Sequence, residues 1–350
     1  MTGTREVDGA GERWTDAPAL PAPLLQVQDL VAQYPIPRGA IGVLSRRPKQ
    51  VVHAVDGVSF SLMEGEMLAL VGESGCGKTT TAQTVMRLVD PAGGSVRFRG
   101  EDITTLRSRE LRPLRRRMQL IYQDPYDSLD PRFRVLQTVE EPLLVHRTGS
   151  KAERRERVVH ALERAGLAPA DLFLDRYPHE LSGGQRQRVA VAAALVLEPE
   201  LLVADEPVSM LDVSVRAEIL GLLDGLRKRG GMAILMITHD LSTAAHFADR
   251  IAVMYLGRIV EEGPAKEVVR NPQHPYTRAL LSVVPKRDPR DRSTPVILQG
   301  ETPNAVRIPT GCRFHPRCPV AEERCTRDDP ALHRPREATR DDHRAACVLV

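Results

Sequence analysis

The sequence lacks an apolar run long enough to span a membrane, which takes ~20 residues in a helix. Its longest run, residues 189–197, is only about half that length. Residues 1–16 are polar and have no apolar core of the kind that a secretory signal needs. We therefore expect the chain to stay in the cytosol and to reach a membrane only through partner proteins.

The sequence also lacks an excess of charge of one sign. Its 49 Lys and Arg residues nearly balance 46 Asp and Glu residues, giving a net charge of +3, so nucleic acid is not an expected partner. We find no long internal repeat and no heptad run. With 350 residues, 42% of them hydrophobic, the chain can form one large domain with an appendage, or two domains.

Cysteine is nearly absent from the first 311 residues, in which Cys76 is the only one. In a reducing cytosol, a cluster of cysteines favours metal or cluster binding over disulfides. The spacing C-x5-C-x6-C-x21-C contains no C-x2-C pair of the common zinc type. A [4Fe–4S] cluster, a zinc ion with His315 as a further candidate ligand, and free thiols all remain open. The clustered cysteines are Cys312, Cys318, Cys325 and Cys347.

A complete phosphate-binding loop is present at residues 72–79, which read GESGCGKT and match G-x-x-x-x-G-K-[ST]. An apolar strand expected at 67–71 precedes it and a helix expected at 79–89 follows, a context that a chance glycine turn would lack. We expect Lys78 to reach the β- and γ-phosphates and the Thr79 hydroxyl to bind Mg²⁺. The candidate nucleotide-binding residues here are Gly72, Ser74, Gly75, Cys76, Gly77, Lys78, Thr79 and Thr80.

Several polar residues directly follow short apolar segments that we expect to be strands. Asp205 and Glu206 end one of them, and the carboxyl ends of strands are where α/β folds bind ligands. We expect Asp205 to hold Mg²⁺ and Glu206 to accept a proton from an attacking water. Gln123 and His239 follow two other segments. Alone, the Asp-Glu pair would indicate a solvated turn and the histidine a structural residue. Because a phosphate loop is also present, we expect these residues to form one site with it.

A second glycine-rich anion binder occurs at residues 181–185, which read LSGGQ. Ser182 is a good helix N-cap, and glycines at a helix start leave N–H groups free for an anion. Standing alone, the motif would indicate a simple cap. Because one nucleotide needs only one phosphate loop, we expect this motif to act on a nucleotide shared with a second chain. The candidate residues are Ser182, Gly183, Gly184 and Gln185.

The order of the expected elements predicts an α/β fold. Short apolar strands alternate with helices, as in a parallel sheet covered by helices. Longer alternating strands are expected at 24–34 and 51–62, a helical region at 135–181 and a hairpin at 251–260. From about residue 285 the chain becomes rich in Pro, Arg and Cys and loses periodicity.

Taken together, six ordered motifs over roughly residues 24–270 resemble the ATP-binding subunit of ABC transporters. The resemblance implies a P-loop NTPase core with an antiparallel β-subdomain and a helical subdomain at about 125–185. We expect a disordered leader at 1–22, an ATP-binding domain at 23–270 and a small cysteine-rich C-terminal extension at 271–350.

The resemblance also implies roles for single residues. Gln123 would be the Q-loop residue that contacts Mg²⁺ or the attacking water, and His239 the switch histidine on the γ-phosphate. Asp212 would be the D-loop aspartate, and Tyr34 would stack on adenine. The implied catalytic residues are Glu206, His239, Gln123 and Lys78, and the implied Mg²⁺ ligands are Thr79, Gln123 and Asp205.

Five segments resemble the oligopeptide/dipeptide/nickel importer branch in their residue sequence: 72–77, 122–132, 205–215, 274–280 and 311–319. Some ATPases of that branch carry a [4Fe–4S] cluster in the tail. The implied cargo is peptides, with nickel or another small solute as the alternative.

The implied cofactors are ATP and Mg²⁺, bound between two ATPase subunits. The implied partners are a second ABC ATPase subunit, two permease subunits and, indirectly, an extracytoplasmic solute-binding protein, with the chain at the cytoplasmic face of the membrane. The competing class is a soluble ABC-type ATPase of translation or DNA repair, for which a second ATPase unit or a coiled coil would be expected. Exporter and sugar-importer ATPases are a third class, but the latter tend to end in a β-rich domain.

Overall fold

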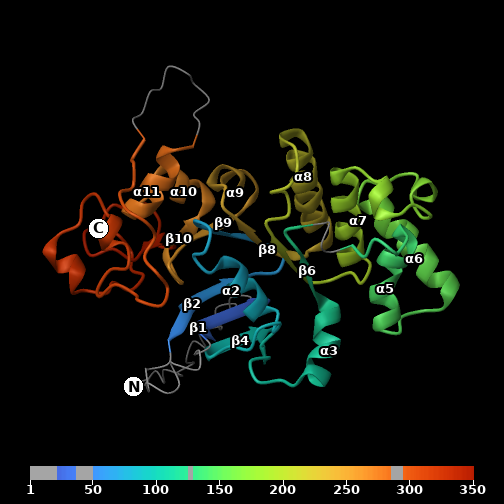
Figure 1. Ribbon diagram of the computed structural model, residues 1–350, viewed down its shortest axis with the longest axis horizontal. Coiled ribbons are helices and arrows are strands. Elements are labelled where there is room, and N and C mark those ends of the chain that lie inside the picture. The colour runs from blue at the N-terminus through green and yellow to red at the C-terminus, as the bar shows by residue number, and fades with distance from the viewer. Residues whose placement is uncertain (1–21, 37–49, 125–128, 285–294) are drawn as a thin grey trace, which may run out of the picture.

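The computed structural model describes residues 22–36, 50–124, 129–284 and 295–350. The expected leader, apart from its last residue, lies outside these ranges. The described residues form two sheets, a group of helices beside the larger sheet and an irregular C-terminal tail on the opposite side (Figure 1).

The larger sheet has seven strands in the order β11-β10-β9-β3-β8-β7-β6. Its parallel strands are the short apolar segments of the sequence, and β3 is buried at every residue because helices and the second sheet cover both faces. The parallel strands are β3 (Met67–Val71), β6 (Met118–Ile121), β7 (Leu201–Asp205), β8 (Ala233–Thr238) and β9 (Arg250–Tyr255).

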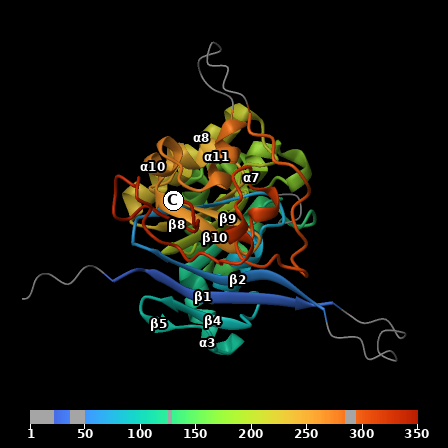
Figure 2. The same cartoon turned by 90° about the vertical axis from the view of Figure 1, so that its left-hand side faces the viewer.

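The smaller sheet is antiparallel, in the order β2-β1-β4-β5, and lies below the larger one in Figure 2. The expected alternation in β2 is confirmed, since Val58, Phe60 and Leu62 are all buried. Helix α2 (Lys78–Val85) contacts strands of both sheets and so joins them. The strands are β1 (Leu25–Pro35), β2 (Val51–Leu62), β4 (Gly93–Phe98) and β5 (Glu101–Asp102).

The helical region expected at 135–181 contains α5 and α6, and Ser150 and Glu153 start α6 with a reciprocal capping box. The expected helix at 79–89 is shorter: it ends at Val85, because Arg87 takes a left-handed φ of 52°. The helices are α3 (Ser108–Arg117), α5 (Val135–Val145), α6 (Lys151–Arg164), α7 (Gly183–Leu195), α8 (Val213–Gly230), α9 (Leu241–Phe247), α10 (Ala265–Arg270) and α11 (Pro275–Ser282).

The predicted hairpin is confirmed. Strands β9 and β10 (Arg258–Pro264) pair across Leu256 and Gly257, whose φ values of 43° and 80° suit a tight hairpin turn. No helix among the described residues combines the length and the apolar character needed to cross a membrane.

The tail returns to the larger sheet through a buried polar cluster that the sequence does not reveal. Strand β11 (Arg344–Ala345) pairs with β10, and beside this pairing Glu261 and His343 are both fully buried. The Glu261 carboxylate lies 2.8 Å from the His343 ring nitrogen Nε2 and accepts hydrogen bonds from the backbone N–H groups of Gln273 and His274. This one side chain therefore fastens three separate segments together.

Replacing Glu261 with Ala should destabilise the protein strongly. The change leaves two backbone donors and a ring nitrogen without their acceptor in a buried place, at a cost of about 3 kcal/mol. Urea unfolding of the full chain measures this. The matched control is Glu323→Ala, at a side chain 86% exposed, which should change the free energy of unfolding by less than about 0.5 kcal/mol. Equal effects of the two changes would contradict the role of Glu261.

Candidate functional site

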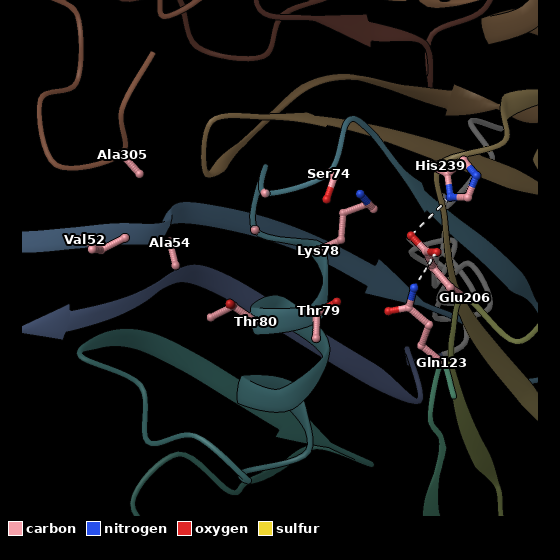
Figure 3. A pocket seen from close by; sticks show the side chains of 12 residues that line it. Val52, Ala54, Ser74, Lys78, Thr79, Thr80, Gln123, Glu206, His239 and Ala305 are labelled. Atoms are coloured by element: carbon pink, nitrogen blue, oxygen red, sulfur yellow. Dashed lines mark hydrogen bonds and ion pairs between the residues drawn. The ribbon is translucent and has the colours of Figure 1, made fainter. Parts of the chain in front are cut away.

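Four polar segments meet at the carboxyl edge of the larger sheet. The phosphate loop follows β3, His239 follows β8, Asp205 ends β7 and Gln123 lies just beyond β6; these four strands are neighbours in the parallel part of the sheet. The predicted clustering of these residues is therefore confirmed. They surround a pocket of about 550 Å³, lined by Val52, Ala54, Ser74, Gly75, Gly77, Lys78, Thr79, Thr80, Gln123, Glu206, His239 and Ala305 (Figure 3).

The phosphate loop is held in a strained backbone path that only glycine allows. Gly77 has a φ of 109°, and a Cβ atom there would lie 2.1 Å from the carbonyl oxygen of Ala54. Lys78 is buried, and its ammonium donates to the carbonyl oxygens of Gly72 and Glu73 at 2.8 and 2.9 Å. The lysine is thus folded back over its own loop, with its charge at the pocket.

A hydroxyl and a carboxylate lie together beside the loop, as a magnesium site requires. The Thr79 hydroxyl donates to the Asp205 carboxylate at 3.3 Å. Burial raises the pKa of Asp205, the charge of Glu206 adds to the rise, and the Thr79 hydrogen bond and Lys78 oppose it. The oxygen atoms of Thr79 and Asp205 are the kind of ligand that Mg²⁺ prefers, and a divalent cation would offset the cost of the buried carboxylate.

The Glu206 carboxylate lies between two other polar side chains. The Gln123 side-chain amide donates to one of its oxygens at 3.1 Å, and the Nδ1 atom of His239 lies 3.2 Å from the other (Figure 3). Glu206 itself has a φ of 44°, and its N–H donates to the carbonyl oxygen of Ile237 on β8. This local geometry turns the carboxylate into the pocket, where it can accept a proton from a water molecule.

The pocket has two chemically different ends. Figure 3 shows Gln123, Glu206 and His239 at one end and the small apolar side chains of Val52 and Ala54 at the other, with Lys78 between them. Ala305, from the C-terminal tail, lies at the apolar end as well. Nothing in the sequence marks these apolar residues, because they belong to no motif and Ala305 is far from the loop along the chain.

Several of the expected nucleotide-binding residues do not line this pocket, among them Tyr34, Gly72, Cys76 and Asp205. Tyr34 is 39% exposed and pairs with Val52 across β1 and β2, next to the pocket wall. Cys76 is buried behind the loop, where its carbonyl oxygen accepts from the N–H of Gly257 and burial raises the pKa of its thiol. Cys76 is therefore a packing residue of the loop rather than part of the pocket wall.

The second glycine motif lies away from this pocket. The Ser182 hydroxyl accepts from the N–H of Gln185, so the predicted N-cap of α7 is confirmed. A Cβ atom at Gly184 would lie 2.8 Å from Val215 of α8, so this glycine is needed for the close packing of α7 against α8. Asp212 is the N-cap residue of α8 and also lies outside the pocket lining.

The four tail cysteines lie around one small pocket, together with His274 and Phe314. Burial raises the pKa of Cys312 to about 11, and the other three thiols add to the rise. The residues that the structure describes, however, contain no group of three or more His, Cys, Asp or Glu side chains placed to hold a metal ion. The expected [4Fe–4S] or zinc centre is therefore not supported by the arrangement of the described residues. The cysteines are Cys312, Cys318, Cys325 and Cys347.

Two family models match the chain. The model described as "ABC transporter" covers residues 55–209, and the model described as "Oligopeptide/dipeptide transporter, C-terminal region" covers residues 260–325. Relatives match over nearly the whole chain. A probable peptide ABC transporter ATP-binding protein of Sinorhizobium fredii is 48% identical, over 88% of this chain and 86% of its own length. The dipeptide transport ATP-binding protein DppF of Escherichia coli is 44% identical, over 91% of this chain and 93% of its own length.

Solved structures agree with the fold. The dimeric ATP-binding cassette MJ0796, in a post-hydrolysis state with ADP and Pi, matches with a TM-score of 0.60 and 30% identity, over 69% of this chain and 99% of its own. Part of the ABC transporter complex cbiONQ, cbiO1 of Clostridium perfringens, matches with a TM-score of 0.60 and 31% identity, over 71% of this chain and 91% of its own. The resemblance drawn from the sequence is confirmed: the chain belongs to the ATP-binding proteins of ABC transporters and carries the C-terminal region of their oligopeptide/dipeptide branch.

Proposed function

We propose that the pocket at the carboxyl edge of the larger sheet binds Mg²⁺-ATP and hydrolyses it. The observation that carries this proposal is the convergence of the phosphate loop, the Thr79–Asp205 pair and the Gln123–Glu206–His239 group on a single pocket. Hydrolysis of this kind is mainly a matter of positioning and charge, since the phosphoryl group needs little covalent help from the protein.

Each group then has a defined task. The loop N–H groups and Lys78 bind the phosphates. Thr79 and Asp205 would hold Mg²⁺, which would neutralise charge on the phosphates. Glu206 accepts the proton of the attacking water. Gln123 and His239 each hold one oxygen of that carboxylate and thereby fix its orientation; once the γ-phosphate enters, His239 is placed to donate to it.

We propose that two such subunits sandwich two nucleotides. The motif Ser182–Gln185 starts α7 with its N–H groups at the helix end, an arrangement suited to an anion, yet it lies away from the pocket of its own chain. It therefore serves the pocket of a partner subunit, and Asp212 beside it belongs to the same interface. The match to a cassette solved as a dimer with ADP and Pi supports this assignment.

We propose that the ATPase powers the import of di- or oligopeptides. The relatives are named as peptide or dipeptide transport ATP-binding proteins, and the matching C-terminal region carries the same description. In this role residues 23–270 form the ATP-binding domain and 271–350 the extension. The subunit works at the cytoplasmic face of the membrane with two permease subunits and, through them, a solute-binding protein. Nickel or another small solute is the alternative cargo.

We also propose that the four tail thiols take up a [4Fe–4S] cluster when iron and sulfide are supplied. Their number and type suit such a cluster, and they already lie around one pocket at the end of the chain. Small movements of the tail would be needed to bring the thiols to the cluster, whose thiolate ligands would then hold the tail together.

Replacing Glu206 with Gln should leave ATP binding intact and slow hydrolysis by about 100-fold or more, because the amide cannot accept the proton of the attacking water. The measurement is steady-state phosphate release together with light scattering, which should show dimers that persist in ATP. The control, Glu163→Gln on the exposed side of α6, should behave as the wild type. Near-normal turnover by the Glu206 variant would refute the assignment of the base.

Replacing Asp205 with Asn should raise the thermal unfolding midpoint of the nucleotide-free protein at neutral pH. The folded chain holds Asp205 at a raised pKa, so it binds a proton before the unfolded chain does, and wild-type stability increases as the pH falls through that pKa. The advantage of the variant should therefore vanish in mild acid. Stabilisation by Mg²⁺-ATP should be smaller in the variant than in the wild type.

The control for this measurement is Asp171→Asn, at a side chain 83% exposed. It should change neither the unfolding midpoint nor the stabilisation by Mg²⁺-ATP. A lower unfolding midpoint for the Asp205 variant at neutral pH without Mg²⁺ would show that the buried charge of Asp205 does not destabilise the folded protein.

Protein purified without oxygen should contain about four iron and four sulfide ions per chain if the cluster forms. The variant Cys325→Ser should lose this iron, whereas Cys76→Ser, in the phosphate loop, should retain it. Colourless, iron-free protein from the anaerobic preparation would rule out the cluster.

A further inference from the structure

We infer that the tail segment 302–306 forms one wall of the nucleotide pocket and packs against the sugar and base of the bound nucleotide, with Ala305 setting the room available there. This inference rests on the proposed function, because it concerns the same pocket. It assigns the C-terminal tail a direct part in nucleotide recognition.

The position of Ala305 is the first observation. Ala305 lines the pocket from the tail, where it joins Val52 and Ala54 of β2. The N–H of His53, between those two, donates to the carbonyl oxygen of Ala305 at 3.0 Å. The tail therefore runs against β2 at this point, and the backbone hydrogen bond fixes where Ala305 lies.

A second set of contacts fastens the same segment to the phosphate loop. The Glu73 carboxylate accepts from the Arg317 guanidinium at 2.8 Å and from the Thr302 hydroxyl at 3.0 Å. Arg317 also donates to the Thr302 hydroxyl at 3.2 Å, and its guanidinium lies over the Tyr255 ring. The Arg317 side chain is only 10% exposed, so this ion pair is shielded from water and held by packing.

The direction of the nucleotide follows from the chemistry at the two ends of the pocket. The γ-phosphate must lie near Glu206 for hydrolysis, and the other phosphates lie along the loop at Lys78. The sugar and base must then extend away from Glu206, toward Val52, Ala54 and Ala305 (Figure 3). Small apolar side chains leave room for a flat base and suit its faces, so this end accepts the part of the nucleotide that carries no charge.

The test compares ligands with and without a sugar and base. Replacing Ala305 with Leu should weaken ATP binding by about tenfold or more, because the larger side chain occupies the space of the base. Binding of inorganic tripolyphosphate, which has neither sugar nor base, should stay within about twofold of the wild-type value. Calorimetric titration of the full chain gives both affinities, and the control Ala331→Leu, at an exposed alanine of the tail, should change neither.

The outcomes separate this inference from the proposed function. Unchanged ATP affinity in the Ala305 variant overturns the inference, and so does an equal loss of ATP and tripolyphosphate, which would place the effect on the loop. Loss of the phosphate-loop lysine in Lys78→Ala should weaken both ligands. If that variant binds ATP as well as the wild type does, the proposed function itself fails.

A second variant tests the fastening of the segment and does not depend on filling the pocket. Arg317 acts through Glu73 and Thr302 and is a positioning residue, so Arg317→Ala should raise KM for ATP by about threefold to tenfold with kcat nearly unchanged. Arg317→Lys, which can still pair with Glu73, should recover part of this loss. A fall in kcat without a change in KM would contradict the positioning role.

Discussion

The parallel pairing of four neighbouring strands is the constraint on which the site depends. Because β3, β8, β7 and β6 run in the same direction, the residues that follow them arrive at one edge of the sheet. The hydrogen bond from Glu206 to Ile237 continues this pairing one residue beyond Asp205 and brings Glu206 within reach of His239. The loop lysine, the carboxylates and the histidine therefore occupy fixed positions at this edge.

Two charged side chains at this edge of the sheet are buried, which fixes their geometry but costs free energy. Lys78 and Asp205 are both nearly inaccessible to water. Backbone carbonyl oxygens satisfy the ammonium, whereas the Thr79 hydroxyl gives Asp205 a single weak hydrogen bond. Burial of this carboxylate therefore costs stability, and a cation bound beside it would offset that cost. Groups held in this way need little rearrangement when charge develops on a phosphate, which is the main advantage of a preorganised site.

The sequence predicted those features of the structure that depend on residues close together in the chain. The flanks of the phosphate loop, the Ser182 cap and the turn at Leu256–Gly257 each depend on residues a few positions apart. It did not predict the early end of α2, where Arg87 adopts a left-handed conformation without a glycine. It also missed Glu261–His343 and Ala305, since these contacts join segments far apart in the chain, and neither a buried hydrogen bond nor a small apolar wall leaves a periodic signal.

The tail shows how a segment with few apolar residues can be ordered by a larger neighbour. Two arginines anchor it: Arg313 is paired with Asp56 of β2 and donates to the carbonyl oxygen of Leu256, and Arg317 is paired with Glu73. Arg313 directly follows Cys312, and Arg317 directly precedes Cys318. The tail segment that carries these two cysteines therefore also contacts the phosphate loop. Only a few covalent bonds separate the thiols from the arginines that form the ion pairs. Order in the tail and order at the nucleotide pocket are consequently properties of one connected structure, which explains why a peripheral segment can contribute a wall to the central site.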